Sequence, residues 1–208
     1  MPHPERRLRP EFDRQMRTAL VGGVPAGTVV GCVYALLDTD KEALYVGTST
    51  GTSERLKDRL SRHVPNGRSD AANKVFPPYE VRYVRVWLVM PQPVMRDVTR
   101  QERATVRGLE RHLLWRMLQG PVPPFPPLNE DVPRQAPPVV RVPPSVDIDY
   151  WPSTDVDAIA QLGDIDARVN RWAESVSRLA ERVKHGDAND VLRDVQKRQI
   201  ARLASLVV

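Results

Sequence analysis

The chain contains a single cysteine, Cys32, so no disulfide can form within it. No apolar run approaches the roughly 20 residues that a membrane-spanning helix requires. The basic N-terminus MPHPERRLRPEFDRQMR is not followed by the apolar segment of a secretory signal. Cysteine and histidine nowhere show the spacing of a zinc site. These absences predict a reduced, cytoplasmic protein without a membrane segment or structural zinc.

Aromatic residues make up only 6% of the chain, whereas hydrophobic residues (41%) and charged residues (27%) are at ordinary globular levels. The net charge of +5 is unevenly distributed. Residues 151–208 hold nine basic and nine acidic residues, and residues 1–150 hold 22 basic and 17 acidic ones. A basic body indicates a polyanionic partner such as nucleic acid, or else a chance excess of charge on a solvated surface.

Hydrophobic periodicity and turn signals predict a small α/β domain. In chain order the patterns predict a helix over residues 10–20, strands over 29–37 and 43–46 that form a hairpin, a helix from Thr52 or Ser53 to just before Pro65, a strand over 81–90, and a helix over 99–119. This order is typical of a three-stranded, antiparallel-containing sheet flanked by helices. The first 28 residues would form a basic N-terminal arm that includes the short helix.

Residues 121–144 hold ten of the twenty prolines. Because proline excludes regular helix and interior strand, we expect an extended surface strap, which we delimit as 131–152. Beyond it, apolar residues recur at alternating spacings of four and three, at Ile165, Val169, Trp172, Val176, Leu179 and Val183. This pattern predicts a helical hairpin over 153–208 that packs on the first domain, on a second copy of the chain or on another protein.

The predicted hairpin carries two tripeptides, CVY at residues 32–34 and YVG at residues 45–47, ten residues apart. They resemble the paired tripeptides that name the GIY-YIG nuclease family. The chain departs from the family pattern at Cys32, where the family usually has glycine; Gly31 lies one position early. The resemblance covers about residues 29–130. It implies a GIY-YIG-like fold and a divalent-metal-dependent DNA endonuclease.

The family places an arginine, often followed by histidine or tyrosine one turn later, on the helix after the second tripeptide. Arg59 and His63 match this pair, four residues apart. Arg55 is a competing match, because it lies closer to the usual distance from the glycine. The resemblance implies that the arginine neutralises charge on the phosphate and that the histidine assists as proton acceptor or phosphate donor.

The resemblance implies distinct roles for the two phenols. Tyr34 would be the general base, and Tyr45 would position water or phosphate. A phenol with an ordinary pKa near 10 is a poor base unless a nearby cation lowers that pKa. DNA backbone contacts are expected from three basic residues of the same helix, Arg55, Lys57 and Arg62.

The segments GLERHLLWRMLQ and PLNE resemble the family's later motifs, a glutamate on a helix and an asparagine in the loop beyond it, although their spacing is longer than usual. The resemblance then implies that Glu110 holds Mg²⁺ or Mn²⁺, with waters and phosphate oxygens completing the coordination. Asn129 would orient the phosphate or anchor its loop. Glu102 is the alternative carboxylate.

Members of this family act in restriction, repair, intron homing and the processing of phage or mobile-element DNA, and the sequence does not choose among these roles. Two further functions fit the same residues. One is a catalytically degenerate nucleic-acid-binding module, in which the change at Cys32 has altered the site. The other is a protein-interaction module that acts through residues 153–208, whose neutral charge and apolar seam favour protein contact.

Overall fold

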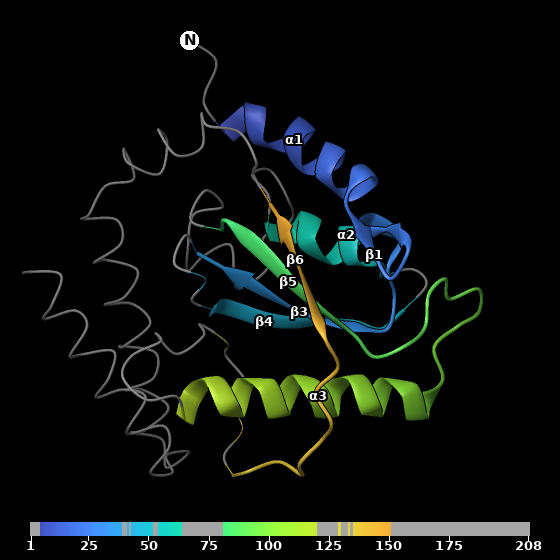
Figure 1. The fold of residues 1–208 in the computed structure, drawn as a ribbon, viewed down its shortest axis with the longest axis vertical. Helices are drawn as coiled ribbons and strands as arrows, with labels where there is room; N and C mark the ends of the chain where they lie inside the picture. Colours follow the sequence, from blue (N-terminus) through green and yellow to red (C-terminus); the bar gives the residue numbers. More distant parts are fainter. Residues whose placement is uncertain are drawn as a thin grey trace, which may run out of the picture.

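The computed structural model of the chain describes residues 5–38, 41, 43–51, 54–63, 81–119, 129, 133 and 135–150. Its elements, in chain order, are α1 (Glu5–Thr18), β1 (Leu20–Val21), β2 (Val24–Pro25), the 3₁₀ turn η1 (Ala26–Thr28), β3 (Cys32–Leu37), β4 (Ala43–Ser49), α2 (Leu56–Leu60), the 3₁₀ turn η2 (Ser61–His63), β5 (Tyr83–Leu88), α3 (Arg100–Gln119) and β6 (Ser145–Asp149). Figure 1 shows three layers, with α1 and α2 on one side of the main sheet and α3 on the other.

The main sheet has four strands in the order β4-β3-β5-β6, and every neighbouring pair is antiparallel. The central strand β3 pairs on one side with β4, where Tyr34 lies opposite Gly47, and on the other side with β5, where Tyr34 lies opposite Val86. The expectation of a mixed α/β fold with an antiparallel sheet is confirmed.

The fourth strand corrects the expectation of a three-stranded sheet. The strap predicted over residues 131–152 contains β6, which pairs with β5 at the edge of the sheet. Residues 145–150 contain no proline and alternate polar and apolar residues, which suits a strand with one buried face. Ile148 is only 4% exposed and packs in the core, and Asp147 pairs with Arg85 of β5, with 2.7 Å between Oδ1 and Nε.

Side chains alternate between the two faces of β3, and each face has its own core. The face toward α1 and α2 buries Cys32, Tyr34 and Leu36 together with helix residues that include Phe12, Met16, Leu56 and Leu60. The face toward α3 buries Val33, Ala35 and Leu37 together with Val106, Leu109 and Leu113. Hydrophobic packing therefore fixes both α2 and α3 against the same two central strands.

Several element boundaries differ from those expected. The first helix begins at Glu5 rather than at residue 10 and includes Pro10. The segment expected only to break that helix forms the small β1–β2 hairpin, because Gly22 and Gly23 both adopt positive φ angles (60° and 82°) that such a tight turn requires.

The helix that carries the candidate arginines is shorter than expected. The residue that caps α2 is Arg55, whose backbone N–H donates to Oδ2 of Asp58 at 3.1 Å. Thr52 and Ser53, the expected caps, lie outside the described residues, as does the predicted helical hairpin over 153–208.

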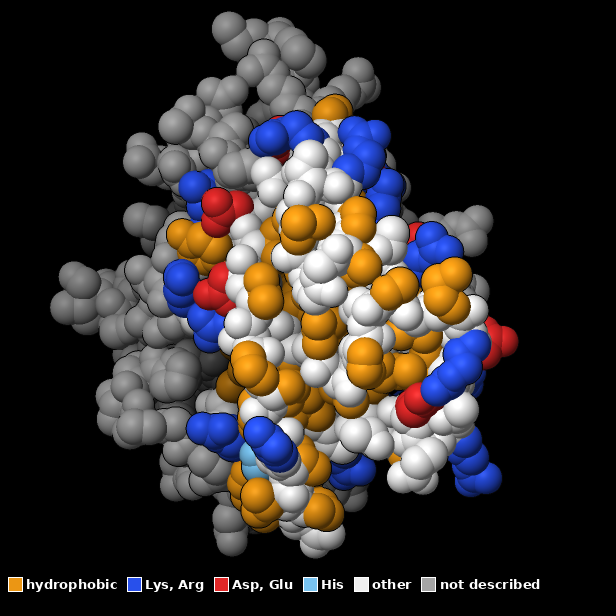
Figure 2. All heavy atoms as spheres, turned by 45° about the vertical axis from the view of Figure 1, so that its right-hand side comes forward, with side chains coloured by type: hydrophobic (Ala, Val, Ile, Leu, Met, Phe, Trp, Pro, Cys, Tyr) orange, Lys and Arg blue, Asp and Glu red, His pale blue; other side chains and the backbone are white. Residues whose placement is uncertain are grey.

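Surface composition differs between the middle and the margin of the face seen in Figure 2. Hydrophobic side chains lie near the middle of that face, and Lys and Arg side chains lie mainly around it. None of the described helices combines the length and the apolar character that crossing a membrane demands.

Candidate active site

Tyr34 and Tyr45 come from neighbouring strands and lie on the same face of the sheet, toward α2. Their ring centroids are 6.3 Å apart, with an angle of 39° between the ring planes. Tyr34 is completely buried, whereas Tyr45 is only partly buried. The hairpin therefore brings the two phenols together as the resemblance implied, and it leaves one of them with access to solvent.

Gly47 is the cross-strand partner of Tyr34, and the Tyr34 ring lies directly over it. A Cβ atom at position 47 would lie 2.6 Å from both Cζ and the hydroxyl oxygen of Tyr34, and 2.9 Å from Cε1 of Tyr45. These distances are far shorter than ordinary carbon contacts. The glycine that ends the second tripeptide is thus the residue that makes room for the tyrosine pair.

Arg59 of α2 extends to the same tyrosine pair. Its guanidinium interacts with the Tyr34 phenol and acts to lower the pKa of that phenol, and its side chain is only 20% exposed. Glu54 lies on the other side, with 3.8 Å between its Oε1 and Nη1 of Arg59, and the same oxygen is 3.1 Å from Nη2 of Arg62. Among the described residues, no hydrogen-bond partner meets the buried Nε of Arg59.

The electrostatics of the cluster follow from its burial. Burial raises the pKa of Tyr34 well above its ordinary value and Tyr45 adds to this rise, whereas Arg59 acts to lower that pKa. Burial acts to lower the pKa of Arg59, but Tyr34 and Glu54 outweigh it and the pKa is raised. At neutral pH the pair is therefore a protonated phenol beside a guanidinium cation.

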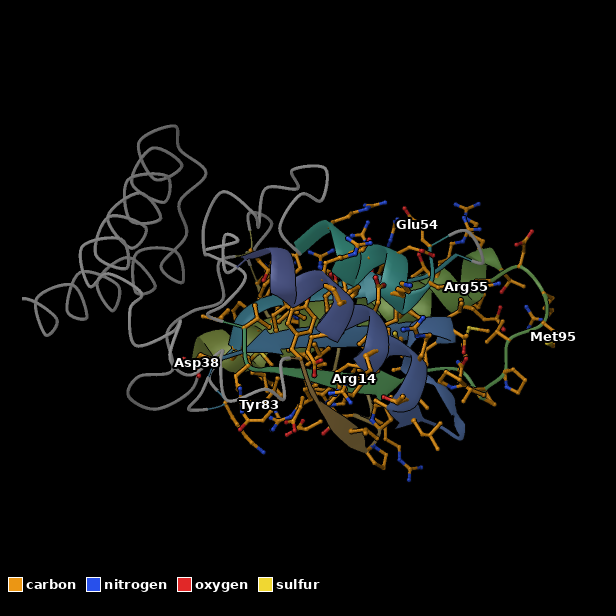
Figure 3. The ribbon with its side chains drawn as sticks, turned by 90° about the horizontal axis from the view of Figure 1, so that it is seen from above. Arg14, Asp38, Glu54, Arg55, Tyr83 and Met95 are labelled. Atoms are coloured by element: carbon orange, nitrogen blue, oxygen red, sulfur yellow. The ribbon has the colours of Figure 1, made fainter. Side chains whose placement is uncertain are left out.

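The competing arginine, Arg55, has a different environment. It is exposed at the start of α2, next to Glu54 (Figure 3). It lines an open pocket of about 420 Å³ between α1 and α2 whose other lining residues are Met16, Arg17, Pro25, Gly27, Thr28, Lys57 and Asp58. Of the two candidate arginines, Arg59 is the one that lies against the tyrosines.

Glu110 lies on α3, which covers the opposite face of the sheet. Val106 and Leu114, one turn before and one turn after it, are buried, so Glu110 is on the inward side of the helix and is itself half-buried. The structure therefore does not place this carboxylate in the same layer as Tyr34 and Arg59. Both α2 and α3 contact β4, the strand at one edge of the sheet.

Asn129 lies at that edge. Its Nδ2 donates to the carbonyl oxygen of Val46 at 2.7 Å, and its Oδ1 accepts from the backbone N–H of Val46 at 2.9 Å. The Val46 side chain belongs to the core beneath α3. Of the two roles that the resemblance offered for Asn129, the observed hydrogen bonds match the anchoring one.

Glu102, the alternative metal ligand, serves as a capping residue of α3. It accepts from the backbone N–H and the hydroxyl of Thr99 (2.8 and 2.9 Å) and from both terminal nitrogens of Arg96 (2.8 and 2.6 Å). These partners, Arg96 first, lower the pKa of Glu102 to about 2. The sequence signal for this capping box was the Thr-x-x-Glu spacing at residues 99–102.

His63 and Glu54 both differ from what the sequence predicted. His63 lies in the 3₁₀ turn η2 rather than in the α-helix, and its side chain is outside the described part of the structure. The role of Glu54 as the partner of Arg59 and Arg62 was not anticipated. Because these pairs are five and eight residues apart and Glu54 precedes the helix, no helical spacing rule signals them.

The donor set for a metal ion is small. Within the described ranges, no group of three or more His, Cys, Asp and Glu side chains converges. One hard carboxylate such as Glu110 suits Mg²⁺, which usually keeps several waters and takes substrate phosphate oxygens as further ligands. A magnesium ion at Glu110 would therefore need waters and phosphate oxygens as its other ligands.

Comparison with known proteins identifies no matching family model, curated protein or solved structure.

Proposed function

We propose that this protein is a divalent-metal-dependent DNA endonuclease of the GIY-YIG type, which hydrolyses phosphodiester bonds. The observation that carries this proposal is the arrangement of Tyr34, Tyr45 and Arg59 around Gly47. The guanidinium of Arg59 is partly buried beside two phenols, and its buried Nε–H has no hydrogen-bond partner among the described residues, which suits an anion better than a hydrophobic core.

Arg59 would neutralise the charge that accumulates on the phosphate. A guanidinium keeps its proton at all physiological pH values and can form two parallel hydrogen bonds to phosphate oxygens. Tyr34 and Glu54 both interact with this guanidinium, and its side chain is only 20% exposed, so part of its conformational freedom is already lost before the phosphate binds.

The burial of Tyr34 changes the roles that the resemblance implied for Tyr34 and Tyr45. Because Tyr34 is inaccessible and its pKa is raised, we assign it to positioning Arg59. Tyr45, which keeps some exposure, would contact the attacking water or the phosphate. This assignment follows the accessibility of the two phenols.

Glu110 would hold Mg²⁺ or Mn²⁺, which, when bound, supplies polarisation of the phosphoryl oxygen and stabilisation of the leaving oxygen. Because Glu110 and Arg59 belong to opposite layers, the proposal places the scissile phosphate at the outer edge of β4. Asn129, bound to Val46 at that edge, would keep its segment clear of the phosphate.

One observation favours a second function. The complete burial of Tyr34, with Glu110 in the other layer, is what a DNA-binding domain without cleavage activity would tolerate. Such a module would bind DNA through its basic residues and leave the backbone intact.

The cleavage rate and the DNA affinity of Arg59→Lys separate the two functions. Lysine keeps the positive charge but lacks the planar guanidinium, which can donate two parallel hydrogen bonds to a phosphate. We therefore expect the single-turnover cleavage rate of a labelled duplex with Mg²⁺ to fall by about 100-fold. The affinity for the same duplex in EDTA should change little. Metal-dependent cleavage by the variant at the wild-type rate would contradict the assignment of Arg59.

A further inference from the structure

Helix α3 carries five arginines and only two glutamates, Glu102 and Glu110. Four of the arginines are exposed and follow one another at spacings of three, four and four residues, at Arg100, Arg103, Arg107 and Arg111. At 100° per residue these spacings place them along one side of the helix. We call this set the α3 arginine row.

The α3 arginine row lacks the acidic partners that several other arginines have. Arg14, Arg85 and Arg96 each form an ion pair with a nearby carboxylate. No ion pair joins any member of the row to a carboxylate in the described part of the chain. Glu102, the acidic residue nearest its start, is engaged by Arg96 and Thr99.

This arrangement is unfavourable for the helix itself. Arg103 and Arg107, and Arg107 and Arg111, are like-charge neighbours at i and i+4, which destabilise an isolated helix. A helix face selected only for solubility would gain from alternating Glu and Arg at these positions. A row of unpaired like charges becomes favourable when a polyanion lies along it.

The dimensions of the row suit a nucleic-acid backbone. From Arg100 to Arg111 the helix rises by roughly 17 Å at 1.5 Å per residue. Double-stranded DNA carries one negative charge per about 1.7 Å of its axis, so several phosphates lie within that length. Buried Val106, Leu109 and Leu113 pack α3 against the sheet, and all four arginines of the row are exposed.

We propose that the α3 arginine row binds the phosphate backbone of DNA next to the candidate site. The choice of DNA as the polyanion rests on the proposed function. Glu110 lies three residues after Arg107 on the same helix, so a backbone held along the row would pass close to the candidate metal ligand. The contacts would be to phosphates, and the row would therefore add affinity without sequence specificity.

A matched pair of charge reversals on α3 tests this proposal. Arg107→Glu changes the middle of the row, and Arg116→Glu makes the same change nine residues away, on the opposite side of the helix. Both residues are exposed. Affinity would be measured by fluorescence anisotropy on a 20-base-pair duplex in EDTA, and stability by thermal melting. We expect Arg107→Glu to weaken binding by about ten-fold or more and Arg116→Glu by less than about two-fold.

The melting temperature distinguishes a binding role from a structural one. Arg107→Glu converts two like-charge pairs, with Arg103 and Arg111, into opposite-charge pairs, and it converts one opposite-charge pair, with Glu110, into a like-charge pair. The balance still favours the helix, so we expect its melting temperature to be unchanged or slightly raised while its DNA affinity falls. Lower affinity accompanied by a lower melting temperature would overturn the proposal, because the loss would then follow from a damaged helix.

The salt dependence gives a second readout. Replacing all four arginines of the row by glutamine should reduce the slope of log affinity against log salt concentration by up to about 3.6, since each lost phosphate contact removes about 0.9. An unchanged slope, or a loss of binding to anionic vesicles or polyglutamate instead of DNA, would overturn the proposal. If the row variants lose DNA binding and the wild type never cleaves DNA, the α3 arginine row is a DNA-binding surface and the nuclease proposal is wrong. If the row variants bind DNA normally and the wild type cleaves it, the nuclease proposal is supported and the proposed role of the α3 arginine row is wrong.

Discussion

At Gly47 a single hydrogen stands where any other residue would place a Cβ atom, and the Tyr34 ring occupies the space above it. Gly47→Ala would put that Cβ 2.6 Å from the ring. We expect the free energy of unfolding to fall by about 1–3 kcal/mol, as for other overpacked sites, and DNA cleavage to decline because the phenols are displaced.

Gly108, in the middle of α3, provides the matched control. No atom lies within 4 Å of a Cβ built there, so Gly108→Ala should raise the free energy of unfolding by about 0.5–1 kcal/mol. Chemical denaturation of both variants measures the two effects. Equal stability of Gly47→Ala and the wild type would show that the tyrosine pair does not depend on Gly47.

Glu102 makes the stability of α3 depend on pH. Its pKa is lowered from 4.5 to about 2 by Arg96 and Thr99, so its stabilising contribution is present above pH 4.5 and is lost as the pH falls toward 2. Glu102→Gln should therefore melt below the wild type at pH 7 and at nearly the same temperature at pH 2. Thermal melts at both pH values measure this, and a difference that does not depend on pH would contradict the role of the ionised carboxylate.

At the residue scale, the sequence predicted that the two tyrosines lie together, but it did not decide which arginine lies beside them. Period-two alternation is enough to put Tyr34 and Tyr45 on one face of a hairpin. The choice between Arg59 and Arg55 depended on where α2 begins, and a cap at Arg55 has no sequence signal. The capping role of Glu102 was readable from its spacing to Thr99, yet the same glutamate also fitted a ligand pattern.

At the scale of elements, β6 completes the sheet that holds the candidate site. Ile148→Ala removes a side chain that is only 4% exposed, so we expect a loss of about 2–5 kcal/mol in the free energy of unfolding. Val146→Ala, on the same strand at 39% exposure, should change it by about 0.5 kcal/mol or less. Urea denaturation compares the two. Similar small losses for both would mean that β6 does not belong to the cooperative fold.

Strong periodic segments were the elements that the sequence predicted best. The helix expected over 99–119 is α3 (Arg100–Gln119), and the strand expected over 81–90 contains β5 (Tyr83–Leu88). The strand β6 was missed because its five residues follow a proline-rich stretch whose composition dominates the pattern. Its pairing with β5 is a contact between distant parts of the chain, which local patterns do not report.

At the scale of the whole molecule, the candidate residues are divided between two layers. Arg59 and the tyrosines belong to the α2 side of the sheet, and Glu110 and the α3 arginine row belong to the other side (Figure 1). The helices of both layers contact the edge strand β4, and Asn129 binds the backbone of Val46 on that strand. We therefore expect DNA to lie across the edge of the sheet at β4 and to contact both layers.

The most direct measurement is the cleavage of supercoiled plasmid DNA, and of a branched synthetic duplex, with Mg²⁺, with Mn²⁺ and with EDTA. The account predicts that the wild type nicks or linearises DNA only when the metal is present and that Glu110→Gln loses this activity. Glu102→Gln, a matched change on the same helix, should retain it at pH 7 below its melting temperature. DNA that is bound but not cleaved by the wild type in either metal would contradict the nuclease assignment and leave a DNA-binding module.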